Sequence, residues 1–231
     1  MLKIAGHEEE RRGANLMAWY AGRGAAQVFA HEGEALLLER LTGPSLMEMA
    51  QGGHDDDASR ILCRAAAQLH AARDRLPPAG LVPLEIWFAA LAPVAAAHGG
   101  TFAKSAAAAQ RLLATPRDIV VLHGDLHHEN VLNGGARGWL AIDPKGLVGE
   151  RGFDFANLFR NPDEAVALTP GRLCRQLRIV AVEAGLEPAR LLQWILAYAG
   201  LGAAWSLAGG HDHDAEVGLQ IAEAAACELP I

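Results

Sequence analysis

The decapeptide HGDLHHENVL, residues 123–132, constrains the fold of this chain more than any other segment. It follows the run DIVVL and precedes the run GWLAID, and both runs are apolar and too short for helices. Glycines at positions 134, 135 and 138 separate ENVLN from GWLAID, which is the pattern of a β-hairpin. The segment therefore predicts a tight polar loop between buried strands, with Asp125 and Asn130 pointing into one cleft.

The remainder of the chain divides near Leu41. Before it, MLKIA alternates in the manner of a strand, EEERRGANLMAWYAG has helical spacing, and AAQVFA and EALLLERL predict two strands. Beyond the connector TGPS nearly every other segment is helical, and the run HDDDASRILCRAAAQLHAARDRL begins with acids and carries Arg73 and Arg75 in its expected last turns. We expect an α+β fold with a small N-terminal lobe, residues 1–41, and a mainly helical lobe, residues 42–231.

Composition narrows the functional class. The chain has 231 residues, of which 51% are hydrophobic, and its formal net charge is −7. A net negative charge disfavours nucleic acids and anionic membranes as partners, and a cationic small molecule fits better. The three cysteines are far apart and form no CxxC pair, which favours a reducing compartment. We find no signal peptide and expect no apolar run near ~20 residues, so we predict a cytoplasmic protein and leave its oligomeric state open.

Three polar residues in and after the segment 123–132 are of the types that phosphoryl transfer requires. That reaction needs a base for the attacking hydroxyl, oxygen ligands for Mg²⁺ and a cation on the nucleotide phosphates. Asp125 is the candidate base, while Asn130 and Asp143, which the hairpin returns beside it, are candidate magnesium ligands. Lys3 is the candidate phosphate-binding cation. A carboxylate on the following helix would orient it, with Glu10 the first choice and Glu9 the next.

These segments resemble the aminoglycoside phosphotransferases, a branch of the protein-kinase-like fold, and most closely the streptomycin 6-kinase and hydroxyurea-resistance group. HGDLHHENVL is similar to the family's catalytic loop, IDPKGLVGERGFDFANL to its metal-binding segment, and ALLLERL to the linker between the lobes. The resemblance implies a two-lobed ATP- and Mg²⁺-dependent kinase whose acceptor is a hydroxyl of an aminoglycoside such as streptomycin, or hydroxyurea. It also implies that the backbone near Glu39 to Leu41 binds adenine and that Asp154 braces the catalytic loop.

One departure from the family pattern concerns the N-terminus. Two strands and a Gly-rich loop normally precede the lysine strand, whereas this sequence begins two residues before Lys3, so we expect an abbreviated N-terminal lobe and weaker catalysis. Either the start is internal or the chain is a truncated relative, and a nucleotide-binding pseudo-kinase is the corresponding alternative. Around EEERR, Arg12 could also occupy the position of the family's carboxylate.

Two further interpretations stay open at this point. His123, His127 and His128 together with Asp125 could form the metal site of a hydrolase, although no closing ligand at helical spacing is present. His123 is more simply a loop-bracing residue whose ring hydrogen-bonds to the backbone. Lys145 either contacts phosphate or is an exposed lysine after a strand, and the sequence does not decide between them.

Overall fold

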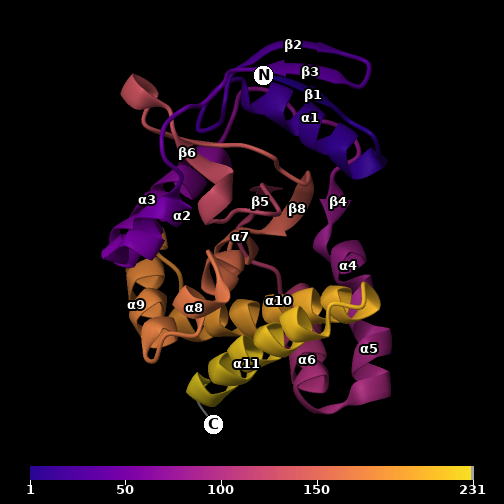
Figure 1. Ribbon diagram of the computed structural model, residues 1–231. Coiled ribbons are helices and arrows are strands. Elements are labelled where there is room, and N and C mark those ends of the chain that lie inside the picture. The colour runs from indigo at the N-terminus through magenta and orange to yellow at the C-terminus, as the bar shows by residue number, and fades with distance from the viewer. Residues whose placement is uncertain (230–231) are drawn as a thin grey trace.

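The computed structural model describes residues 1–229. Its N-terminal part is an antiparallel sheet in the order β1-β3-β2 with one helix against it (Figure 1). The elements are β1 (Leu2–Ile4), α1 (Glu8–Tyr20), β2 (Val28–Glu32) and β3 (Ala35–Leu38). Leu16, Met17 and Tyr20 lie on the buried face of α1. The helical spacing of the sequence predicts Leu16 and Tyr20 on this face together with Trp19, which is only partly buried. All three strands and the helix agree with the sequence-based prediction, and the lobe boundary at residue 41 stays a prediction.

The connector after β3 ends in a capped helix. Ser45 and Glu48 form a capping box at the start of α2 (Leu46–Met49), and a further irregular turn, Ala50–His54, leads into α3 (Asp55–His70). The prediction that Arg73 and Arg75 lie in the last turns of this helix was wrong, because the backbone leaves the helical conformation at Ala71. Arg73 instead turns back and donates to the carbonyl oxygen of Leu69 at 2.7 Å, satisfying a group at the helix end.

The remaining chain contains two small sheets and most of the helices. One sheet has the order β4-β8-β5, with β5 and β8 antiparallel, and β6 and β7 form the predicted hairpin. The strands are β4 (Val82–Pro83), β5 (Ile119–Leu122), β6 (Val131–Asn133), β7 (Trp139–Ala141) and β8 (Leu147–Glu150). The helices are α4 (Leu84–Trp87), α5 (Leu91–His98), α6 (Gly100–Ala114), α7 (Phe153–Ala156), α8 (Glu164–Ala167), α9 (Arg172–Ala184), α10 (Pro188–Ala208) and α11 (Asp212–Glu228).

The helix α10 is the centre of the helical part. It packs against α6, α7 and α11, and it is long and apolar enough by composition to cross a membrane (Figure 1). The expectation that no segment reaches this length was therefore wrong. Because 72% of its apolar window is buried inside the protein, the hydrophobicity of α10 is that of a core helix.

The small sheets lie between the N-terminal sheet and the helical part (Figure 1), and the segment after β7 lies against α1. Gly13 of α1 lies directly against the carbonyl oxygen of Pro144, and a Cβ at this position would overlap it. Glycine therefore allows α1 to approach the segment after β7 closely enough to bring its acidic first turn beside Asp143 and Lys145.

Candidate active site

The catalytic loop is held by a buried carboxylate. Asp154, at the start of α7, accepts hydrogen bonds from the backbone N–H groups of His123 at 2.9 Å and Gly124 at 2.8 Å. It also contacts His70 Nε2 at 2.8 Å. Burial alone would raise the pKa of Asp154, but the hydrogen bond from His70 and the nearby positive charge lower it overall. The carboxylate is thus the expected brace of the loop.

His123 fixes the same loop from the inside. Its Nε2 donates to the carbonyl oxygen of Ile142 at 2.8 Å, and its Nδ1 accepts from the N–H of Asp125 at 3.2 Å. Burial lowers the pKa of His123, which favours the neutral ring that this pair of contacts requires. The ring joins the catalytic loop to the strand before Asp143, as the sequence suggests for a loop-bracing histidine.

Asp125 is the third residue of the catalytic loop, and its two carboxylate oxygens have different neighbours. Asn157 Nδ2 donates to its Oδ1 at 3.0 Å, and His127 Nε2 lies 3.7 Å from the same oxygen. Lys145 Nζ lies 3.7 Å from Oδ2. The side chain is 27% exposed, so Oδ2 keeps access to a reactant while Oδ1 is fixed by an amide.

Asn130 and Asp143 lie beside Asp125. Asn130 Nδ2 donates to the carbonyl oxygen of Asp125 at 2.9 Å, and no hydrogen bond within residues 1–229 reaches Asn130 Oδ1. Asp143 has φ 58°, a conformation that few residues other than glycine adopt, and its side chain is 47% exposed. The N–H of Ile142 donates to the carbonyl oxygen of Asn130, so the two candidate ligands are on adjacent backbone segments.

Lys3 has a different partner from the one expected. Its Nζ donates to Asp143 Oδ1 at 2.6 Å. Glu10, the first choice, instead accepts from the N–H of Gly6 at 2.6 Å, which is the main cause that lowers its pKa. Glu9, the second choice, pairs with Lys145 at 3.1 Å. The predicted ion pair between Lys3 and Glu10 or Glu9 is therefore not formed. All five of these charged side chains nevertheless line one cavity of 20 Å³, which is about the size of a single water.

The segment Glu39 to Leu41 follows β3 directly. The N–H of Glu39 donates to the carbonyl oxygen of Gln27 at 2.8 Å, and the Glu39 carboxylate pairs with Arg137. No backbone hydrogen bond within residues 1–229 uses the N–H of Leu41 or the carbonyl oxygen of Glu39. These two backbone groups are therefore available to a ligand, whereas the Glu39 carboxylate is already paired.

A cavity of 460 Å³ is lined by Asp125, and Lys3 is not part of its wall. Its wall includes the catalytic loop, Lys145, Asn161 and a pair of tryptophans, Trp87 and Trp205, whose ring centres are 5.3 Å apart. The volume lies within the range of small-molecule sites, and the mixture of aromatic and polar walls is typical of them.

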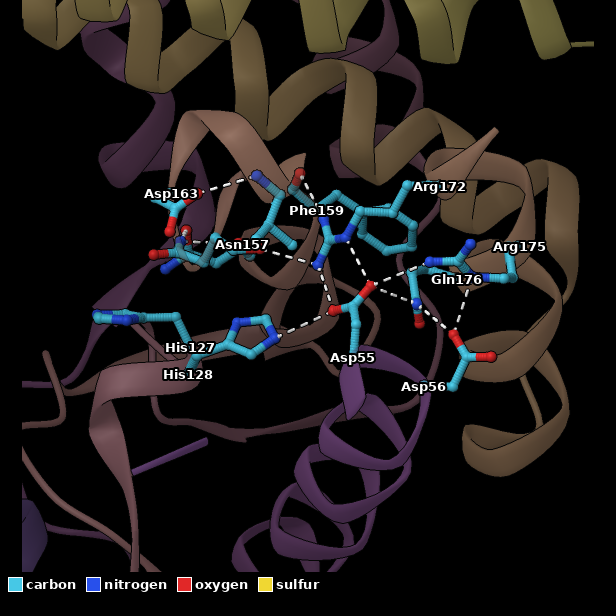
Figure 2. Close-up of polar contacts among 12 residues, drawn as sticks. Asp55, Asp56, His127, His128, Asn157, Phe159, Asp163, Arg172, Arg175 and Gln176 are labelled. Atoms are coloured by element: carbon cyan, nitrogen blue, oxygen red, sulfur yellow. Dashed lines mark hydrogen bonds and ion pairs between the residues drawn. The ribbon is translucent and has the colours of Figure 1, made fainter. Parts of the chain in front are cut away.

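The histidines do not form a metal site in the part of the chain that the structure describes, where no group of three or more His, Cys, Asp or Glu side chains could hold a metal ion. The ring of His128 points toward Asp55, with Nε2 3.9 Å from Asp55 Oδ1 (Figure 2). Burial and the neighbouring Arg172 lower the pKa of His128 to about 3, so this ring is neutral.

Two side chains in this site were missed by sequence reasoning. Asn157 contacts Asp125, and Asn161 lines the cavity and donates to Asn157. Both belong to the motif FDFANLFRN, in which an asparagine carries no helical periodicity signal. Their spacing of four residues across η5 (Asn157–Arg160) is the only indication in the sequence that they share a face.

Comparison with known proteins now decides the family. The family described as aminoglycoside/hydroxyurea antibiotic resistance kinase matches residues 1–210. The chain belongs to this family. The kinase is 52% identical over 216 residues to streptomycin 3''-kinase of Klebsiella pneumoniae, covering 91% of this chain and 80% of that protein. It is 31% identical over 241 residues to streptomycin 6-kinase of Streptomyces griseus, covering 97% and 76%.

Solved structures confirm the predicted fold of the kinase. A choline/ethanolamine kinase family protein from Mesorhizobium loti superposes with a TM-score of 0.70 at 16% identity, covering 99% of this chain and 82% of that one. Aminoglycoside phosphotransferase APH(3'')-Id from Streptomyces rimosus, solved with ADP and streptomycin, gives a TM-score of 0.61 at 16% identity, covering 84% and 82%. The expected protein-kinase-like α+β fold and membership of a phosphotransferase family are both confirmed.

Proposed function

We propose that this kinase transfers the γ-phosphoryl group of ATP to a hydroxyl of streptomycin. The observation that carries the proposal is the position of the Asp125 carboxylate, which lies at the wall of a 460 Å³ cavity and within 4 Å of Lys145. The 52% identity to a streptomycin 3''-kinase supports streptomycin as the acceptor and its 3'' hydroxyl as the reacting group.

Asp125 is the proposed base. Its Oδ2, which no hydrogen bond reaches within residues 1–229, would accept the proton of the attacking hydroxyl as the bond to phosphorus forms. The hydrogen bond from Asn157 holds Oδ1, so that the carboxylate keeps one orientation and does not rotate between substrates. Lys145 supplies positive charge next to the oxygens that become more negative during transfer.

The residues present fit a magnesium–nucleotide. Asn130 Oδ1 has no hydrogen-bond partner within residues 1–229, and Asp143 is a partly exposed carboxylate on the neighbouring segment. A site with one carboxylate and one amide oxygen suits Mg²⁺, which takes its other ligands from waters and phosphates. When bound, magnesium neutralises charge on the β- and γ-phosphates. Lys3 would bind the phosphates after leaving Asp143, and the free backbone groups of Glu39 and Leu41 would contact adenine.

The acceptor cavity favours streptomycin over hydroxyurea. A volume of 460 Å³ is suited to a sugar-sized ligand and far exceeds a molecule as small as hydroxyurea. The paired rings of Trp87 and Trp205 offer apolar faces for a saccharide, and the Glu9 carboxylate in the same wall offers a partner for a cationic group. The net charge of −7 agrees with a cationic acceptor.

Mass spectrometry of the acceptor tests the proposal. The purified chain with ATP and magnesium should add one phosphoryl group to streptomycin and none to hydroxyurea, and Asp125→Ala should abolish the product. Phosphorylation of hydroxyurea alone would overturn the choice of acceptor. Nucleotide binding without any product, for either acceptor, would favour the pseudo-kinase alternative.

A further inference from the structure

A buried ion cluster lies behind the catalytic loop and is not part of the reaction described above. Arg172 is 1% exposed and pairs with Asp55 through two hydrogen bonds, Nε to Oδ2 at 2.8 Å and Nη2 to Oδ1 at 2.9 Å (Figure 2). Gln176 Nε2 also donates to Asp55 Oδ2 at 2.6 Å. The cluster joins the start of α3 to α9.

Arg172 has donors left over after this pairing, and they reach the wall of the acceptor cavity. Its Nη2 donates to the carbonyl oxygen of Asn161 at 2.9 Å, and its Nη1 lies 3.4 Å from the carbonyl oxygen of Phe159. These carbonyls belong to the end of η5 and the residue after it. A planar guanidinium has five N–H donors in fixed directions, so one side chain can bind a carboxylate and two carbonyls at once.

From Asn161 the hydrogen bonds continue to the proposed base. Asn161 Nδ2 donates to both the backbone oxygen and the Oδ1 of Asn157, each at 3.0 Å. Because its Oδ1 accepts this bond, the Asn157 amide group must present Nδ2 to Asp125, which it does at 3.0 Å. Without Asn161 the amide could rotate and present an oxygen to the carboxylate instead.

We propose that Arg172 and Asn161 are positioning residues, which fix the orientation of Asp125 through Asn157. The inference rests on the proposed function, since it assigns these residues to the same base. It extends the site from the cavity wall to the ion cluster, by a chain of contacts whose links are Asp55, Arg172, Asn161, Asn157 and Asp125.

A double-mutant cycle tests the link between Asn161 and Asn157. Asn161→Ala should lower kcat for streptomycin phosphorylation about tenfold or more, with KM for ATP unchanged, because a misplaced base slows the chemical step. In the Asn157→Ala background the same substitution should have no further effect, because its route to Asp125 is already removed. An equal fractional loss in both backgrounds would overturn the proposal, as would a rise in KM for streptomycin with kcat unchanged.

Arg172→Lys tests the remote end, and Arg175→Ala is its matched control. Lysine keeps the charge beside Asp55 but lacks the donors for the carbonyl oxygen of Asn161, so kcat should fall. Arg175 lies on the same helix and pairs with Asp56 at 2.9 Å and, more loosely, with Asp55 Oδ2 at 3.6 Å, but no contact joins it directly to Asn161 or Asn157 within residues 1–229. Arg175→Ala should leave kcat unchanged.

Equal losses of kcat in Arg172→Lys and Arg175→Ala would show a general effect of the ion cluster and overturn the proposal. If Arg172→Lys does not fold, the Asn161 cycle decides alone. A wild-type chain without kinase activity would instead overturn the proposed function, so the two failures are distinguishable.

Discussion

Replacing Asp154 by alanine removes the brace of the catalytic loop. The buried backbone N–H groups of His123 and Gly124 donate to Asp154 at 2.9 and 2.8 Å and would lose their acceptor. The ring of His70, whose Nε2 lies 2.8 Å from the same carboxylate, would lose its partner as well. Each buried donor left unsatisfied costs about 1–3 kcal/mol. We therefore expect Asp154→Ala to lower the free energy of unfolding by roughly 3–6 kcal/mol, out of a total of about 5–15 kcal/mol for a typical domain.

Urea unfolding followed by circular dichroism measures this loss. Asp118→Asn is the matched control, because Asp118 lies just before β5, the strand that leads into the catalytic loop, and pairs with Arg151 at the surface. The side chain of Asp118 is 67% exposed. That control should change the free energy of unfolding by less than about 0.5 kcal/mol. If Asp154→Ala lost less than about 1 kcal/mol and kept the wild-type kcat, the bracing role would be refuted.

The same carboxylate predicts a pH dependence with a definite sign. Burial is the largest single influence on the pKa of Asp154 and raises it, but the hydrogen bonds from His70 and Gly124 and the nearby imidazoles together outweigh burial, so the pKa is lower in the folded protein than its ordinary value. Its contribution to stability is therefore complete above the unfolded pKa of ~4 and is lost as pH falls through the folded pKa. The free energy of unfolding should decrease below about pH 4 in the wild type and less steeply in Asp154→Asn. Identical slopes for the two proteins would contradict this assignment.

Two further substitutions test charged groups near and far from the site. Lys145→Met should lower kcat about tenfold, with partial recovery in Lys145→Arg, because the carboxylates of Glu9 and Asp125 would lose the ammonium that lies 3.1 and 3.7 Å from them. An unchanged kcat in steady-state kinetics would rule out a role for this charge. Glu150→Ala should lower the free energy of unfolding by about 3–5 kcal/mol, because it removes the carboxylate partner of the mostly buried Arg190. A loss below about 1 kcal/mol, measured by urea unfolding, would contradict that expectation.

The parts of the site that could be predicted from the sequence are those carried by short contiguous motifs. Asp125 comes shortly after β5, Asn130 directly precedes β6, and Asp143 comes shortly after β7, all strands whose apolar runs are visible in the sequence. The hairpin between β6 and β7 brings the backbone segments of Asn130 and Asp143 next to each other. The strands themselves were predicted for the same reason, except β4 and β8. Strand β4 has only two residues, one of them a proline, and β8 has the sequence LVGE, in which a glycine interrupts the apolar run.

The contacts that could not be predicted depend on packing between distant segments. Three glutamates begin α1, and only the approach of this helix to the segment after β7 decides that Glu9 meets Lys145 while Lys3 meets Asp143. The sequence pattern predicts that Arg172, a charged residue at the start of an amphipathic helix, is exposed, yet it is almost completely buried. Its partner, Asp55, is 117 residues away, and no local pattern connects the two.

The measurement that tests the account most directly is kcat for streptomycin phosphorylation by Asp125→Asn, a substitution that keeps the shape of the side chain and removes the base. A positioned base contributes about 10²- to 10⁴-fold to a rate. The account predicts that kcat falls by about that factor while KM for ATP and the thermal unfolding midpoint stay close to those of the wild type. A variant that phosphorylates streptomycin within about threefold of the wild-type kcat would show that Asp125 is not the base.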